Sequence, residues 1–215
     1  YISQTPENVV YVSKYFPDLT TLLFTYDDPK SESNVLDILI AIIPTPSLPK
    51  ELWPYPLNRL TNKDDLADTI LPVIIIYLCE KQKNVYTSIK ILAACASILS
   101  SFSCDPALLN ILLHRAYSQK YAPYVVEIAL SIQSKEDVIR SGLLKSLLSV
   151  KVNRSISIWF HQKLNKLKEA CKPFARSIPI SISRSKNLAE IVQYIEKEIL
   201  FPFEFCDSKL IEKVT

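Results

Sequence analysis

The chain has 215 residues, of which 48% are hydrophobic, 14 are proline and only one, Gly142, is glycine. A single glycine excludes the usual phosphate-cradling loops, dinucleotide fingerprints and nucleophile elbows, because these motifs need glycines for tight turns and close backbone approach. Lys and Arg outnumber Asp and Glu by 25 to 22, and the resulting net charge of +3 is too small to indicate nucleic-acid or membrane binding by itself.

The first predicted helix spans residues 5–26. Thr5 supplies an N-cap and Pro6 the first helical position, while Pro17 is a point at which the helix can restart. Apolar side chains recur along this segment at spacings of three and four, and their arc is wider than the stripe that usually faces a core. This surplus apolar surface makes four of them candidate partner contacts: Tyr11, Tyr15, Phe16 and Leu19.

A second helix is predicted over 33–43, and it stops at a connection over 44–57 that contains five prolines. Leucines, tyrosine and Trp53 are interleaved with the prolines, whereas flexible linkers are poor in apolar residues. We therefore expect this connection to be packed against the domain. A partner-binding loop that uses Trp53 is the alternative interpretation.

The next two predicted helices cover 64–79, with Pro72 as a kink or restart, and 85–102. The second is apolar over about half of its circumference and Ser, Thr or Ala elsewhere, which is typical of the central helix of a bundle. Its length approaches that of a membrane span, but Lys90 and the hydroxyl side chains favour a core helix in a protein without membrane segments.

Four more helices follow, and each has a recognisable start signal. They are predicted to run to about residues 117, 132, 148 and 171, and Pro173 closes the last one. The start signals combine capping side chains with prolines of the first turn: Asp105 with Pro106, Pro123, Ser134 with Asp137, and Asn153.

The remaining chain contains an extended connection over 175–185, an amphipathic helix over 188–200 and an aromatic tail with Phe201, Phe203 and Phe205. The whole chain, 1–215, is therefore predicted to be a single all-α domain, an irregular multi-helix bundle of eight to ten helices. A short HEAT-like helical stack is the alternative, although the intervals between the predicted helix pairs are unequal.

The sequence contains little that indicates catalysis. His114 and His161 are the only imidazoles, and no His or Cys residues have the spacing of a zinc site within one chain. Five cysteines, most of them in apolar stretches, indicate free thiols in a reducing, intracellular compartment. We predict a protein that is not an enzyme and has no cofactor. The spacing of His and Cys residues neither predicts nor excludes a zinc ion shared with a partner chain.

The segment 151–186 is strongly basic, since it has nine basic residues and one acid, Glu169. On a helical projection its lysines border an apolar stripe, which favours a solvated flank; an acidic protein partner and a nucleic acid are the alternatives. Trp159 lies at the edge of the stripe, as core or as a partner anchor. The basic residues are Lys151, Arg154, Lys163, Lys166, Lys168, Lys172, Arg176, Arg184 and Lys186.

These features favour a non-catalytic helical adaptor that dimerises or docks partners through its first helix and binds short peptides in interhelical grooves. A nucleic-acid-binding helical module that uses 151–186 is the alternative, and direct nucleic-acid binding is the less favoured of the two. The predicted partner contacts are Tyr11, Tyr15, Phe16, Leu19, Trp53, Trp159, Phe201, Phe203 and Phe205.

In size, helix order, the opening segment 5–26 and residue texture, the chain resembles the bridging subunits of fission-yeast shelterin, helical proteins similar in fold to the telomere repeat factor homology domain. The resemblance implies a nuclear homodimer that links double-strand and single-strand telomere-binding proteins through short peptides from each. It also implies that zinc can be shared with a partner. Both histidines of this chain lie beyond residue 110, which leaves the place of such a zinc undefined.

Overall fold

A computed structural model describes residues 14–25, 27–44, 46–55 and 64–175. These residues form nine helices and no strand, so the predicted all-α class and the predicted range of eight to ten helices are confirmed. The helices are α2 (Phe16–Thr25), α3 (Pro29–Ile42), α4 (Asp64–Lys81), α5 (Val85–Ile98), α6 (Pro106–Ala116), α7 (Ala122–Ser131), α8 (Lys135–Arg140), α9 (Leu143–Leu148) and α10 (Arg154–Ala175).

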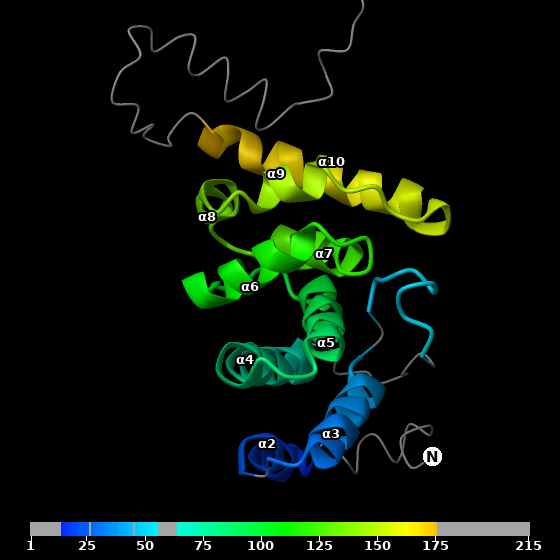
Figure 1. Ribbon diagram of the computed structural model, residues 1–215, viewed down its shortest axis with the longest axis vertical. Helices are drawn as coiled ribbons and strands as arrows, with labels where there is room; N and C mark the ends of the chain where they lie inside the picture. The colour runs from blue at the N-terminus through cyan, green and yellow to red at the C-terminus, as the bar shows by residue number, and fades with distance from the viewer. Residues whose placement is uncertain (1–13, 26, 45, 56–63, 176–215) are drawn as a thin grey trace, which may run out of the picture.

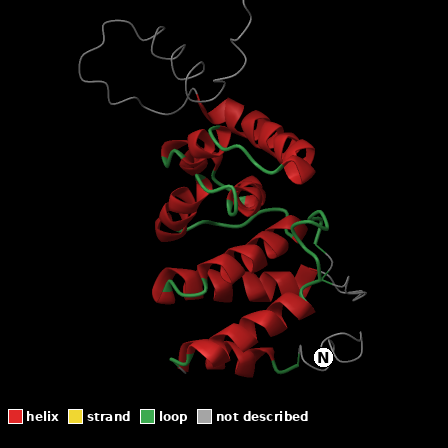
Figure 2. Ribbon diagram, turned by 45° about the vertical axis from the view of Figure 1, so that its right-hand side comes forward, coloured by secondary structure: helices red, strands yellow, loops and turns green. Residues whose placement is uncertain are grey.

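The helices follow one another along the long axis of the molecule in chain order (Figures 1 and 2). α2 and α3 lie at one end, α4 and α5 come next, α6 and α7 follow, and α10 lies across α7, α8 and α9 at the other end. Lengths from 6 to 22 residues make the bundle irregular. This layered order is a feature that the alternative prediction, a short HEAT-like helical stack, shares.

The helix starts follow from capping side chains. Asp105 Oδ1 accepts a hydrogen bond from the Ala107 N–H (2.6 Å), and Ser134 Oγ accepts one from Asp137 (3.2 Å), as their sequence positions predict. α3 begins before the predicted residue 33, because Asp28 caps it and accepts a bond from the Ser31 N–H at 2.9 Å. Local sequence therefore sets several boundaries.

Other predicted boundaries need correction. The helix predicted through residue 148 is two helices, α8 and α9, because Gly142 adopts a left-handed backbone (φ +80°) between them. α5 ends at Ile98 because the Phe102 backbone pairs with Ser131 and Gln133, 2.8 and 2.9 Å away, and does not continue the helix. α10 passes Pro173 and ends at Ala175.

Pro72 lies inside α4 without ending it. The proline is exposed, so its ring faces solvent, where the carbonyl that loses its helical partner can bond to water. The predicted opening helix over 5–26 is described only as α2 from Phe16, and residues 1–13 lie outside the described residues. The connection 175–185, apart from residue 175, and the helix over 188–200 lie outside them as well.

α5 and α7 form the centre of the core. Every side chain in 88–96 and in 122–129 is buried. α4 covers one side of α5, and α10 covers α7. This central pair is the rigid platform on which the connection 46–55 and the carboxyl-terminal helices rest.

The proline-rich connection packs down on this platform. Trp53 is 4% exposed, and the Tyr124 hydroxyl donates a hydrogen bond to the Leu52 carbonyl at 3.0 Å. The ammonium of Lys90, on α5, lies 5.9, 4.8 and 5.7 Å from the ring centres of Trp53, Tyr55 and Tyr86 respectively, within cation–π range. Burial lowers the pKa of Lys90. This aromatic cluster fastens the connection to α5.

Candidate partner-binding groove

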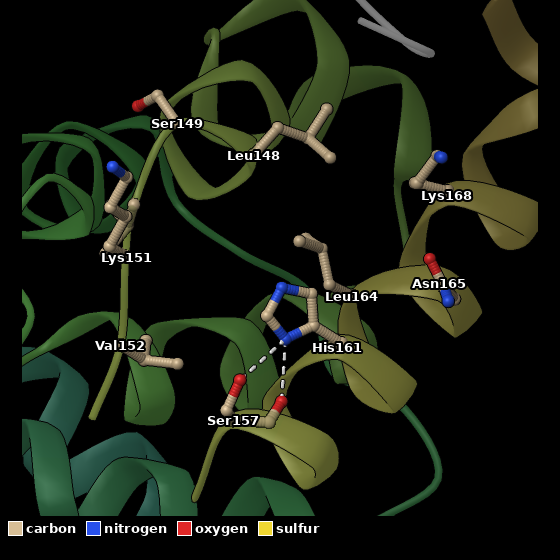
Figure 3. Close-up of a pocket in the computed structure, with 10 residues that line it drawn as sticks. Leu148, Ser149, Lys151, Val152, Ser157, His161, Leu164, Asn165 and Lys168 are labelled. Atoms are coloured by element: carbon tan, nitrogen blue, oxygen red, sulfur yellow. Dashed lines mark hydrogen bonds between the residues drawn. The ribbon is translucent and has the colours of Figure 1, made fainter. Parts of the chain in front are cut away.

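A groove of about 580 Å³ lies where the connection 149–152 passes beside α10 (Figure 3). This volume is within the range of small-ligand and peptide sites. Five of its lining residues come from the end of α9 and the connection, and five come from α10. They are Leu148, Ser149, Val150, Lys151, Val152, Ser157, His161, Leu164, Asn165 and Lys168.

Local backbone bonding positions the connection. The Ser149 N–H donates to the Ser146 carbonyl (3.2 Å) and the Val150 N–H donates to the Leu147 carbonyl (3.4 Å), which tightens the end of α9. Asn153 then starts α10, since its side-chain oxygen accepts a bond from the Ser155 N–H at 3.4 Å. Five residues, 149–153, therefore connect α9 to α10, and the groove is held between fixed ends.

The floor of the groove is apolar and its edges are polar. Leu148 and Leu164 are buried core residues that also line the groove, and Val152 is half-buried beside them. Lys151 is exposed on the connection, and Asn165 is exposed on α10. No lining residue is acidic, whereas two are lysine and one is histidine.

His161 lies between the connection and α10 in Figure 3, next to Ser157. Its Nδ1 is 2.7 Å from the Ser157 carbonyl oxygen and 3.3 Å from the Ser157 hydroxyl oxygen. A carbonyl only accepts, so Nδ1 carries a proton and donates it. This nitrogen therefore cannot take a proton from the hydroxyl, and the pair does not have the geometry of a nucleophile and its base.

The four cysteines that the structure describes are poor nucleophiles for a separate reason. Cys79, Cys95, Cys104 and Cys171 are free thiols. Burial raises the pKa of all four, to about 12 for Cys104 and about 11 for Cys171, and keeps them protonated at neutral pH. Among the described residues there is also no group of three or more His, Cys, Asp or Glu side chains arranged to hold a metal ion.

The basic segment presents fewer cations than its sequence suggests. Lys163 forms an ion pair with the buried carboxylate of Glu127 on α7 (2.8 Å), and its ammonium lies 5.7 Å from the ring centre of the half-buried Trp159. Lys168 is only 9% exposed. Two of the lysines on which a nucleic-acid interface would depend therefore serve the packing of α10.

The remaining predicted partner contacts divide into three groups. Phe16 and Trp53 are buried, at 6% and 4% exposed, so each has a core role in place of the predicted partner contact. Tyr15 is 46% exposed and Leu19 is half-buried on α2. Tyr11, Phe201, Phe203 and Phe205 lie outside the described residues.

None of the predicted partner residues that the structure describes lines the groove, and the sequence does not single the groove out. In the sequence, His161 is one of two histidines without the spacing of a metal site, and Lys151 and Lys168 belong to the basic segment 151–186. The available signal was the short stretch 148–153, in which valines alternate with polar residues between two helices. Such a connection has apolar side chains that must contact something.

Among the described helices, none has both the length and the apolar character that a bilayer crossing requires. Comparisons with protein-family models, with curated proteins and with solved structures found no match to this chain. The functional argument therefore depends on the geometry of the molecule itself.

Proposed function

We propose that the protein is a non-catalytic helical adaptor that holds short segments of partner proteins in the groove between the connection 149–152 and α10. The observation that supports this function is the groove itself, which combines an apolar floor with polar edges at the surface of the helical stack. Concave sites with an apolar floor and a few polar groups at the edge are the usual form of a binding site.

The lining residues suit a peptide better than a reacting substrate. The floor of Leu148, Val152 and Leu164 can receive apolar side chains, while Ser149 and Asn165 can exchange hydrogen bonds with a peptide backbone. The hydrogen bonding of His161 provides no base for Ser157. A site that binds but does not activate is what an adaptor requires.

The test is to pan a display library of short random peptides against the intact chain. Peptides that bind in the groove should lose at least about tenfold in affinity when Asn165→Trp fills it, which corresponds to about 1.4 kcal/mol. Gln162→Trp is the matched control, because Gln162 is exposed on the same helix but does not line the groove. Equal binding to Asn165→Trp and to the unmodified chain would contradict the proposal.

A narrower form of this proposal is that the adaptor links telomere-binding proteins within shelterin, in the nucleus and as a homodimer. Its support is the resemblance in size, helix order and opening segment. Tyr15, one of the predicted contacts, is exposed immediately before α2, and Leu22 is exposed on α2. Sedimentation equilibrium should give twice the chain mass and, for Tyr15→Ala, a shift toward the chain mass; a concentration-independent monomer would end the homodimer proposal.

A further inference from the structure

We infer that the segment held in the groove is acidic, with an Asp or Glu side chain next to an apolar one. This inference rests on the proposed function and specifies the class of partner. It begins from the lining of the groove, in which the exposed Lys151 stands at the edge of an apolar floor and no carboxylate occurs among the described lining residues. A neutral or basic peptide would leave the Lys151 ammonium without an opposite charge.

Lys151 is the key residue of this argument. Its side chain is exposed on the connection, at the edge of the groove (Figure 3), and it forms no ion pair with a described residue. By contrast, Lys163 on α10 already forms an ion pair with Glu127. Lys151 is therefore a cation that a bound carboxylate can reach without breaking an existing ion pair.

The positions of the charges also determine the pattern that fits. Lys151 stands on the connection side and Lys168 on the α10 side, with Leu148 and Leu164 between them. A segment lying along the groove would place an apolar side chain on this floor and a carboxylate at the Lys151 edge. Because the floor excludes water, an ion pair at its edge is stronger than one on an open surface.

A protein segment fits this lining better than a nucleic acid does. The described residues that line the groove include no Phe, Tyr or Trp for base stacking, and its apolar floor offers nothing to a phosphodiester backbone. Two aromatic residues precede His161 on α10, but Trp159 lies by Lys163, Phe160 is buried in the core, and neither lines the groove. An acidic peptide supplies both an apolar side chain for the floor and a carboxylate for Lys151.

The experiment compares the peptides that the display library yields on the unmodified chain with those that it yields on Lys151→Glu. On the unmodified chain, enriched peptides should share an acid next to Leu, Ile or Phe. These peptides should bind Lys151→Glu about threefold to tenfold more weakly at low salt, the range expected for a surface charge pair turned into a repulsion. Panning on Lys151→Glu should instead enrich basic residues.

Lys166→Glu is the matched control, because Lys166 is exposed on α10, carries the same charge and does not line the groove. It should leave the selected peptides bound. Peptides that are lost on Asn165→Trp but show no acidic preference would overturn this inference while the proposed function stands. If no peptide depends on Asn165, both are wrong. A single-stranded oligothymidylate that binds the unmodified chain and is lost on Lys151→Glu would overturn the acidic peptide in favour of a nucleic acid.

Discussion

Lys135 shows how one side chain can close the end of a helix. Its ammonium donates to the carbonyl oxygens of Ala129 (3.2 Å), Leu130 (2.6 Å) and Ile132 at the carboxyl end of α7. These carbonyls lack helical partners, and a cation also complements the negative end of the helix dipole. The ammonium is half-buried, and this burial lowers its pKa. Lys135 therefore links the start of α8 to the end of α7.

We expect Lys135→Met to lower the free energy of unfolding by about 1–3 kcal/mol, because methionine keeps the aliphatic stem but leaves the carbonyls without a donor. Urea denaturation followed by circular dichroism measures this change. Lys145→Met is the control, since Lys145 is exposed on α9 and has no such contacts. Equal effects of the two substitutions would contradict the capping role.

The buried phenol of Tyr77 makes the stability of the fold depend on pH. Its hydroxyl donates to Glu32 Oε2 at 2.9 Å and accepts from Asn84 Nδ2 at 3.1 Å. Burial, with the neighbouring Glu32, raises the pKa of Tyr77 to about 12. An unfolded tyrosine has a pKa of about 10, so the stabilising contribution is complete below pH 10 and is lost as the pH rises toward 12.

Consequently, Tyr77→Phe should make the alkaline decrease in the free energy of unfolding shallower, while costing stability at neutral pH through the lost hydrogen bonds. Urea titrations at a series of pH values from neutral to alkaline measure both effects. Tyr117→Phe, at a side chain that is 64% exposed, should leave the alkaline slope as it is. An unchanged slope in Tyr77→Phe would show that this phenol does not contribute to the alkaline transition.

At the scale of elements, the break between α8 and α9 depends on Gly142. Its φ of +80° is in the left-handed region, and a Cβ placed there would meet no atom within 4 Å. The cost of substitution is therefore conformational and not steric. We expect Gly142→Ala to destabilise the protein by about 1–2 kcal/mol and Gly142→Asn by less, because Asn tolerates this region better. Chemical denaturation ranks the two, and a cost for Asn equal to that for Ala would be inconsistent with a backbone effect.

The elements that could be predicted are those with local causes. Asp105 and Ser134 cap helices through bonds two or three residues away, and a sequence displays such distances directly. The break at Gly142 is not predicted, because the spacing of apolar residues on both sides of this glycine favours one continuous helix. The end of α5 could not be predicted, since Phe102 pairs with Ser131 and Gln133 after the chain has returned from two further helices.

At the scale of the whole molecule, the sequence does not show which apolar side chains the other helices bury and which stay exposed. Tyr15 and Phe16 are neighbours in the sequence, yet one is exposed and the other belongs to the core. The ammonium of Lys90 lies above the ring of Trp53, and no spacing in the sequence predicts this contact. The candidate groove exists only because 149–152 passes beside α10, so its residues could be identified only after the helices were arranged in space.

The chain-order arrangement of the helices has a consequence for how the molecule opens. Because each layer is anchored mainly to its neighbours, amide protons should become accessible from the ends inward, in place of a single all-or-none event. Amides of α5 and α7, whose central residues are wholly buried, should exchange with deuterium most slowly, and those of α2 much faster. Identical exchange rates from α2 to α10 would mean that the layers unfold as one cooperative unit.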